Sequence, residues 1–148
     1  MSCENCNCDS CDCDLGLPVG EQGEAGKPLF INLSYIVAGA PLNNSTTTFV
    51  EAGRFVFNKN ITPSFTAMKN NIWVTGGTAE ITVVDLVSGN TMADFPKTVT
   101  SVSPINVETY TGLSIYPVAN DRIISVQIKH QTGGVNSVRI GSSIFYYG

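Results

Sequence analysis

Apolar and polar residues alternate along much of the chain with the period of two that is typical of half-buried β-strands. In residues 29–37, for example, apolar residues alternate with Asn32 and Ser34; they are Leu29, Ile31, Leu33, Tyr35 and Val37. Comparable stretches predict further strands at Thr46–Phe57, with a bulge at Gly53, at Ala79–Val87, Thr91–Ala93, Ile124–Lys129, Val135–Ile140 and Ile144–Tyr147. The pattern therefore predicts eight to ten short strands.

Turn-forming residues separate these stretches at short intervals. Ser88-Gly89-Asn90 and Thr132-Gly133-Gly134 each favour a hairpin turn. No stretch has the apolar spacing of an amphipathic helix, and charged residues make up only 14% of the chain. We therefore predict an all-β fold, an antiparallel β-sandwich of jelly-roll type over residues 29–148, which follows an extended, irregular N-terminal anchor over residues 1–28.

The N-terminal 28 residues have a composition unlike that of the predicted sandwich. Residues 1–14 are a low-complexity tract of Cys, Asp, Asn, Ser and Glu, and residues 15–28 are a connector with three consecutive Gly-X-Y triplets that begin at Gly20, Gly23 and Gly26. Such triplets let three chains pack around one axis, because only glycine fits there. Three triplets are too few for an independent triple helix, so packing in threes and a flexible glycine-rich linker remain alternatives.

The second half of the chain, from about Thr75 to Gly148, resembles a jelly-roll domain of phage head fibres, decoration proteins and tail-spike tips. The resemblance is carried by Gly76-Gly77, TAEITVVDLVSGNTMA, RIISVQIKHQ and TGGVNSVRIGSSIFYY. With the Cys-rich tract and the Gly-X-Y triplets, the whole chain resembles the small head-fibre proteins of tailed phages, including crAss-like phages. The resemblance implies a homotrimer, an N-terminus next to the capsid and no catalysis, and it assigns no function to a numbered residue.

Charge is distributed unevenly between these two parts. Residues 1–28 contain six acidic residues against Lys27 alone, whereas the other 120 residues contain six acids and seven bases. This pattern does not favour nucleic-acid or membrane partners, which select basic surfaces. Apolar runs end well short of the ~20 residues that a membrane-spanning helix needs, and the N-terminus lacks the features of a signal peptide. We expect synthesis in a host cytoplasm and a final location on the capsid surface of a virion.

All five cysteines lie in the first 14 residues, at Cys3, Cys6, Cys8, Cys11 and Cys13. Closely spaced thiolates can bind zinc or another soft metal. The pairs are too close together for a zinc finger, which needs a dozen or more residues between them. Metal binding or thiol packing at a symmetry axis, disulfides formed after release from the cell, and an unstructured tail all remain open. We expect no required cofactor, and we expect this segment to attach the protein to other virion proteins.

The sequence offers no recognisable catalytic arrangement. The single histidine, His130, falls on the parity of the apolar residues before it, which favours a structural position beside a turn. The six carboxylates of the body are scattered singly, at Glu51, Glu80, Asp85, Asp94, Glu108 and Asp121. We therefore expect a non-enzymatic protein.

Three aromatic residues, Trp73, Tyr110 and Tyr116, are candidates for stacking on sugars. A lone tryptophan in a small sandwich is more often buried or at an interface. The sequence thus leads to one principal hypothesis, a trimeric head-fibre or decoration protein, and to an alternative, a carbohydrate-binding module for host or mucosal glycans.

Overall fold

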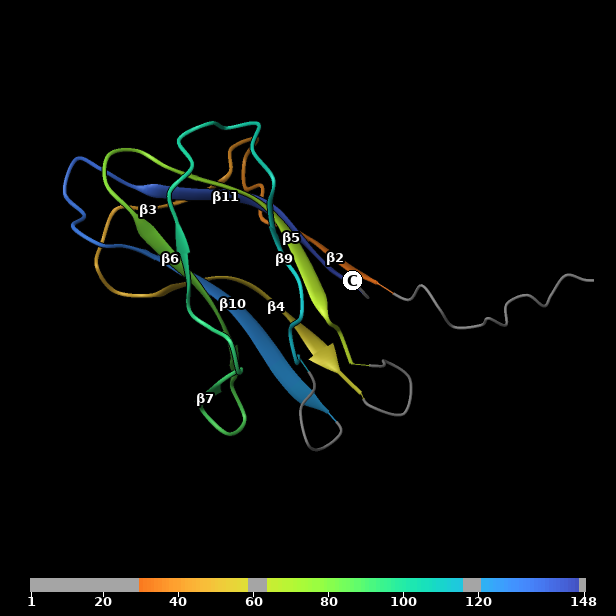
Figure 1. Cartoon of the computed structure of the whole chain (residues 1–148). Coiled ribbons are helices and arrows are strands. Elements are labelled where there is room, and N and C mark those ends of the chain that lie inside the picture. Colours follow the sequence, from red (N-terminus) through yellow and green to blue (C-terminus); the bar gives the residue numbers. More distant parts are fainter. Residues whose placement is uncertain (1–29, 59–63, 116–120, 147–148) are drawn as a thin grey trace, which may run out of the picture.

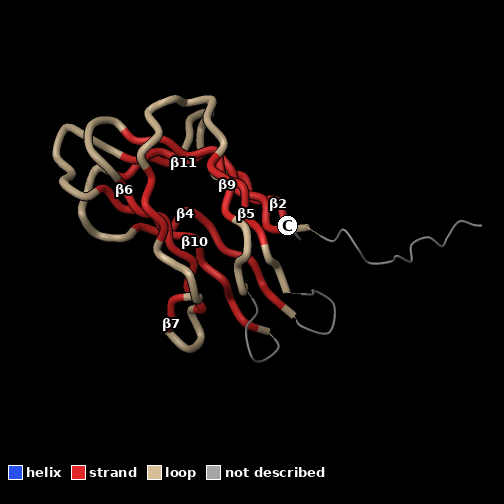
Figure 2. The backbone as a smooth tube through the Cα atoms, viewed as in Figure 1, coloured by secondary structure: helices blue, strands red, loops and turns tan. Residues whose placement is uncertain are grey.

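The computed structural model describes residues 30–58, 64–115 and 121–146. Over these ranges it contains ten strands and no helix (Figures 1 and 2). The strands are β2 (Ile31–Ser34), β3 (Leu42–Asn44), β4 (Val50–Phe57), β5 (Ala67–Val74), β6 (Ala79–Asp85), β7 (Asn90–Thr91), β8 (Lys97–Val99), β9 (Glu108–Tyr110), β10 (Arg122–His130) and β11 (Val138–Tyr146). The predicted all-β class is confirmed.

Two five-stranded antiparallel sheets form the layers of a sandwich (Figure 1). The first sheet has the order β4-β10-β6, and β7 and β8 share the far edge of β6. The second has the order β2-β11-β5-β9, and β3 extends the β2 edge of β11. We refer to these as the β10 sheet and the β11 sheet.

The strand order is that of a jelly roll. When β2 with β3, and β7 with β8, are each taken as one edge, eight strand positions remain. Pairs then form between the first and last positions (β2 and β11), the second and seventh (β4 and β10), the third and sixth (β5 and β9) and the fourth and fifth (β6 and β8). This nested pairing is what a long antiparallel hairpin produces when it wraps into two sheets, so the structure supports the predicted jelly-roll topology.

The core lies between the sheets and receives alternate side chains from each strand. Ile124, Val126 and Ile128 of β10 face Ile72 and Val74 of β5 in one continuous apolar cluster. At one end of the sandwich four phenylalanines stack with ring centroids 5.1–6.4 Å apart. They are Phe55, Phe57, Phe65 and Phe145.

Two bulges interrupt the regular pairing. In β4 the register with β10 skips Ala52, next to the glycine where the bulge was predicted. In β11 it skips Gly141, between Ile140 and Ser142. A Cβ on Gly141 would lie 2.6 Å from the side-chain oxygen of Asn71, so this close approach requires glycine.

Several predicted strand boundaries were wrong. The strand predicted from Thr46 begins only at Val50, since the Thr-rich segment before it forms a bend held by the Asn44 side chain. The predicted Val135–Ile140 and Ile144–Tyr147 strands are one strand, β11, which crosses the Gly141 bulge without a break. Val135 is 99% exposed in the preceding turn.

Candidate functional site

His130 is a structural residue at the end of β10. Its side chain is fully buried. Nδ1 accepts hydrogen bonds from the backbone amides of Thr132 (3.0 Å) and Gly133 (2.9 Å), so the proton resides on Nε2, which donates to the carbonyl oxygen of Gly76 (2.7 Å). Both ring nitrogens therefore hold turns together, which agrees with the structural position predicted from its parity.

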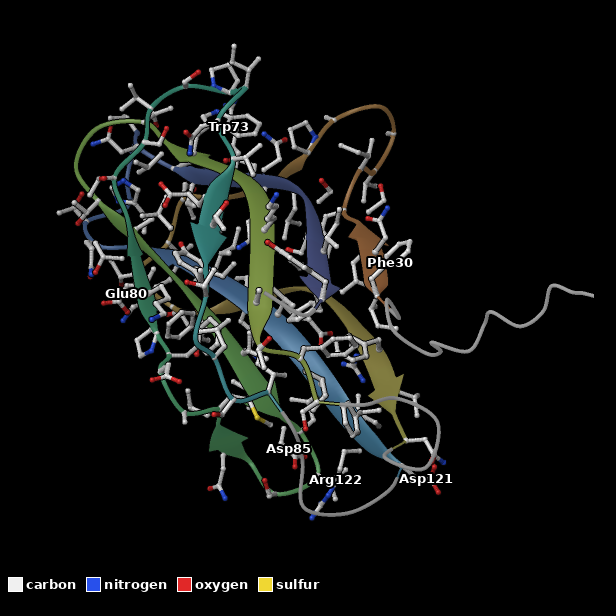
Figure 3. The ribbon with its side chains drawn as sticks, turned by 45° about the vertical axis from the view of Figure 1, so that its right-hand side comes forward. Phe30, Trp73, Glu80, Asp85, Asp121 and Arg122 are labelled. Carbon is white, nitrogen blue, oxygen red and sulfur yellow. The ribbon has the colours of Figure 1, made fainter. Side chains whose placement is uncertain are left out.

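Five of the six carboxylates of the body are bound by other groups of the same chain. Asp85 accepts from the amides of the following turn and lies 3.6 Å from the Arg122 guanidinium, at one end of the sandwich (Figure 3). Asp121 accepts from Asn58, and Glu108 lies 3.4 Å from the Asn106 amide. Within the ranges that the structure describes, no three His, Cys, Asp or Glu side chains come close enough to hold a metal ion.

The outer face of the β10 sheet is a polar surface whose charges are paired. Glu51 and Arg54 are three residues apart, a spacing that would normally put them on opposite faces of a strand. The Ala52 bulge brings both onto the outer face, where Arg54 binds the Glu51 carboxylate with contacts of 2.7–3.1 Å. The carboxylate also accepts from the fully buried Ser125 hydroxyl at 2.5 Å.

Further hydrogen bonds and ion pairs extend this polar surface along β10 and β6. Gln127 donates to the Ser125 hydroxyl at 3.2 Å, while Glu80 lies 3.6 Å from Lys129 and accepts from Gln131 at 2.7 Å. The hydrogen bond from Arg54 is the main reason that the pKa of Glu51 lies below its ordinary value, with a smaller contribution from Ser125. We call this surface the paired face and define it as Glu51, Arg54, Glu80, Ser125, Gln127 and Lys129.

The outer face of the β11 sheet is different: beside polar positions such as Asn32, Lys69 and Ser142, it has a cluster of apolar side chains where β11 ends. In β11 the outward parity carries Ile144 and Tyr146, since Ser143 and Phe145 point into the core. Phe30 precedes β2 and continues this surface; it is 56% exposed and lies on the outside of the sheet (Figure 3). Ile36, which is 50% exposed, contributes near Gly141. We call Phe30, Ile36, Ile144 and Tyr146 the apolar face.

A loop over residues 100–107 adds to this side of the molecule. The Asn71 side chain donates to the carbonyl oxygens of Pro104 (2.9 Å) and Asn106 (3.1 Å), and the amide of Val74 donates to Ser101. The loop presents three further exposed apolar residues, Val102, Ile105 and Val107. On the strands of this outer face the described charged side chains are Lys69 and Arg139, both basic.

The two candidate sugar-binding aromatics that the structure describes, Trp73 and Tyr110, do not form an open stacking surface. Trp73 points outward from β5 but is only 9% exposed, since the loop anchored at Asn71 and Val74 runs past it. Tyr110 packs against the core, with its hydroxyl buried and the Lys97 ammonium 5.8 Å from its ring centre. Burial raises the pKa of Tyr110, and the nearby Glu108 carboxylate raises it further. Tyr116 lies outside the described residues.

The predicted metal ligands, Cys3, Cys6, Cys8, Cys11 and Cys13, also lie outside the described residues, as does the anchor segment 1–28. Along the described ranges, no helix is both long enough and apolar enough to cross a membrane.

The sequence analysis did not predict the apolar face, although the sequence contains a signal for it. The run Ile144-Phe145-Tyr146 has no polar position, so a strand through it must be apolar on both sides. A strand of that kind needs cover on its outer side as well as its inner side, and the alternation rule alone does not reveal this.

Comparison of the chain with protein-family models, with curated proteins and with solved structures finds no match.

Proposed function

We propose that this protein is a non-enzymatic structural protein of a virion, a homotrimeric head fibre or capsid decoration protein that is attached to the particle through residues 1–28. The observation that carries the proposal is the division of the described surface. Its histidine and five of its six carboxylates are engaged within the chain, while Phe30 and Ile36 of the apolar face are 56% and 50% exposed beside the partly exposed Ile144 and Tyr146. Side chains arranged in this way stabilise a scaffold and leave a surface for association.

The position of the chain entry adds to this proposal. Phe30 follows the acidic connector and leads directly into β2, an edge strand of the β11 sheet. The Gly-X-Y triplets from Gly20 to Pro28 precede this entry and are compatible with three chains held side by side.

A direct test is the composition of purified particles from a host culture that produces this protein. We expect the full-length protein to co-purify with density-gradient-purified particles, and a variant that lacks residues 2–14 to remain in the unbound fraction. If the full-length protein were absent from the particles, the virion assignment would be refuted. If the shortened variant were retained equally well, the assignment of residues 2–14 as the anchor would be wrong.

A further inference from the structure

The apolar face begins where the N-terminal connector joins the sandwich. Ile31 pairs with Phe145, so one residue earlier Phe30 comes level with Tyr146 on the neighbouring strand. Both side chains have the outward parity, because Ile31 and Phe145 point towards the core. The connector therefore joins the sandwich at the edge of the apolar face, where Phe30 and Tyr146 lie side by side.

We propose that the apolar face is the surface through which three copies of this chain pack against one another around a common axis. This inference rests on the proposed trimer and names the part of the sandwich that forms it. Its occupant is a second copy of the same chain, in a closed threefold arrangement in which each copy contacts both neighbours.

The length of the connector restricts where such an axis can run. If Gly-X-Y triplets from three chains pack together, Gly26 of each chain lies at the axis. Phe30 is four residues further on, and an extended chain advances about 3.3–3.6 Å per residue. On that condition Phe30 would lie within about 15 Å of the axis, which would place the surface around Phe30 close to the other two copies.

The charges on the two outer faces also favour the apolar face as the contact between copies. Contact between copies removes side chains from water, which favours apolar groups and disfavours charges. The paired face carries Glu51, Arg54, Glu80 and Lys129, whereas the apolar face has Lys69 beside it, with its ammonium 5.6 Å from the centre of the Tyr146 ring. An ammonium held against an aromatic ring can stay near such a contact without an acidic partner.

The inference can be tested with two pairs of substitutions in the full-length protein. The test variant is Phe30→Asp with Ile36→Asp, on the apolar face. The control is Val56→Asp with Val87→Asp, which adds the same charge at residues of comparable exposure (64% and 56%) elsewhere on the surface. Native mass spectrometry and light scattering over a dilution series under reducing conditions give the mass of each species.

We expect a wild-type trimer, a control within threefold of the wild-type dissociation midpoint, and a test variant whose midpoint rises at least 100-fold. A wild-type monomer at micromolar concentration would refute both the trimer and this inference. A test variant that stays trimeric as firmly as the control would refute the apolar face as the contact and leave the trimer standing.

A second measurement decides the matter if the test variant fails to fold. A photo-crosslinking benzoylphenylalanine replaces Phe30 in one sample and Val56 in another. We expect covalent links between copies from position 30 and none from position 56. Equal yields from both positions, or links from position 56 alone, would overturn the proposal.

Discussion

The outer faces of the two sheets differ in how their side chains are satisfied. On the β10 sheet, Arg54 and Ser125 both donate to Glu51, and Glu80 binds Lys129 and Gln131. On the β11 sheet, Phe30 and Ile36 are about half exposed and have no polar groups that hydrogen bonds could satisfy. The polar groups of the paired face are satisfied within a single chain, whereas burial against another surface would stabilise the apolar face.

The difference arises from the same alternation that makes the sandwich. Outward positions of β10 are Ile123, Ser125, Gln127 and Lys129, mostly polar, as expected for a strand with one side in water. Outward positions at the end of β11 are Ile144 and Tyr146, as expected for a strand covered on both sides. Within one jelly roll, the outer side of β10 is therefore mainly polar, whereas the outer side of β11 ends in two apolar residues.

Among substitutions on the two faces, we expect Trp73→Ala to lower the free energy of unfolding most. Trp73 is 9% exposed under the loop over residues 100–107, so its removal leaves a large cavity on the β11 side. We expect a loss of about 3 kcal/mol in the free energy of unfolding, measured by urea denaturation followed by circular dichroism. On a glycan array we expect the folded variant to behave as the wild type does. A selective loss of glycan binding with unchanged stability would instead assign Trp73 to a sugar site.

A smaller change is expected from Asn71→Ala, which releases the same loop without removing the tryptophan. The substitution deletes the donor to the carbonyl oxygens of Pro104 and Asn106, so we expect a loss of about 1–2 kcal/mol. Trp73 is the only tryptophan, and its fluorescence should shift to longer wavelength as water reaches it.

The matched control for this variant is Asn43→Ala, whose exposed side chain makes a long 3.4 Å contact with Arg139. We expect it to change stability by less than about 0.5 kcal/mol and to leave the fluorescence unchanged. An unshifted spectrum in Asn71→Ala would show that the loop does not depend on Asn71.

On the paired face, Ser125→Ala removes a buried hydroxyl that joins Glu51 to Gln127. Because Glu51 keeps Arg54 and both remaining groups can reach water, we expect a loss of about 1 kcal/mol and no change in oligomeric state. Thr98→Ala, at an exposed position of β8 in the same sheet, is the control. Dissociation of the assembly by Ser125→Ala would place the contact between copies on the paired face.

The smallest effect concerns pH. Arg54 lowers the pKa of Glu51 in the folded protein, so the stabilisation from this pair is present at neutral pH and is lost as pH falls through the lowered pKa. We expect Arg54→Met to be slightly less stable than wild type at pH 7, with a difference that shrinks below about pH 4, because both groups are exposed and water screens them. Urea midpoints at pH 7 and pH 3 measure it, and a difference that grew in acid would contradict the assigned sign.

The alternation of residues predicted the fold class and most strands, because it reports which side of a strand is buried. The pattern correctly predicted the strands that begin near Ala79 and Ile124 and the turns that follow them. It missed β3, β8 and β9, since strands of three residues are too short to show a period. It also missed the eight-residue β5, where the inward Asn70 is polar and the outward Trp73 is apolar, so the alternation is broken.

The surfaces were harder to predict than the fold. The sequence made Trp73 a candidate for stacking on sugars while favouring a buried or interface position, but it did not show that a loop about 30 residues further along the chain runs past it. The pairing of Glu51 with Arg54 depends on a bulge that shifts one residue onto the other face. Both features require contacts between distant segments, which a pattern within one segment does not contain. The cysteine hypotheses fall on residues 1–14, outside the described residues, and remain predictions.

The most direct test of the account is hydroxyl-radical footprinting of the full-length protein in its native assembly, read out by mass spectrometry at each side chain. Phe30 and Val56 are similarly exposed in the single chain, at 56% and 64%. We expect Phe30 and Tyr146 to be strongly protected at high protein concentration and to become labelled on dilution, while Val56 is labelled throughout after correction for side-chain reactivity. Labelling of Phe30 that matches its exposure in the single chain at every concentration would contradict the claim that the apolar face is covered by other copies.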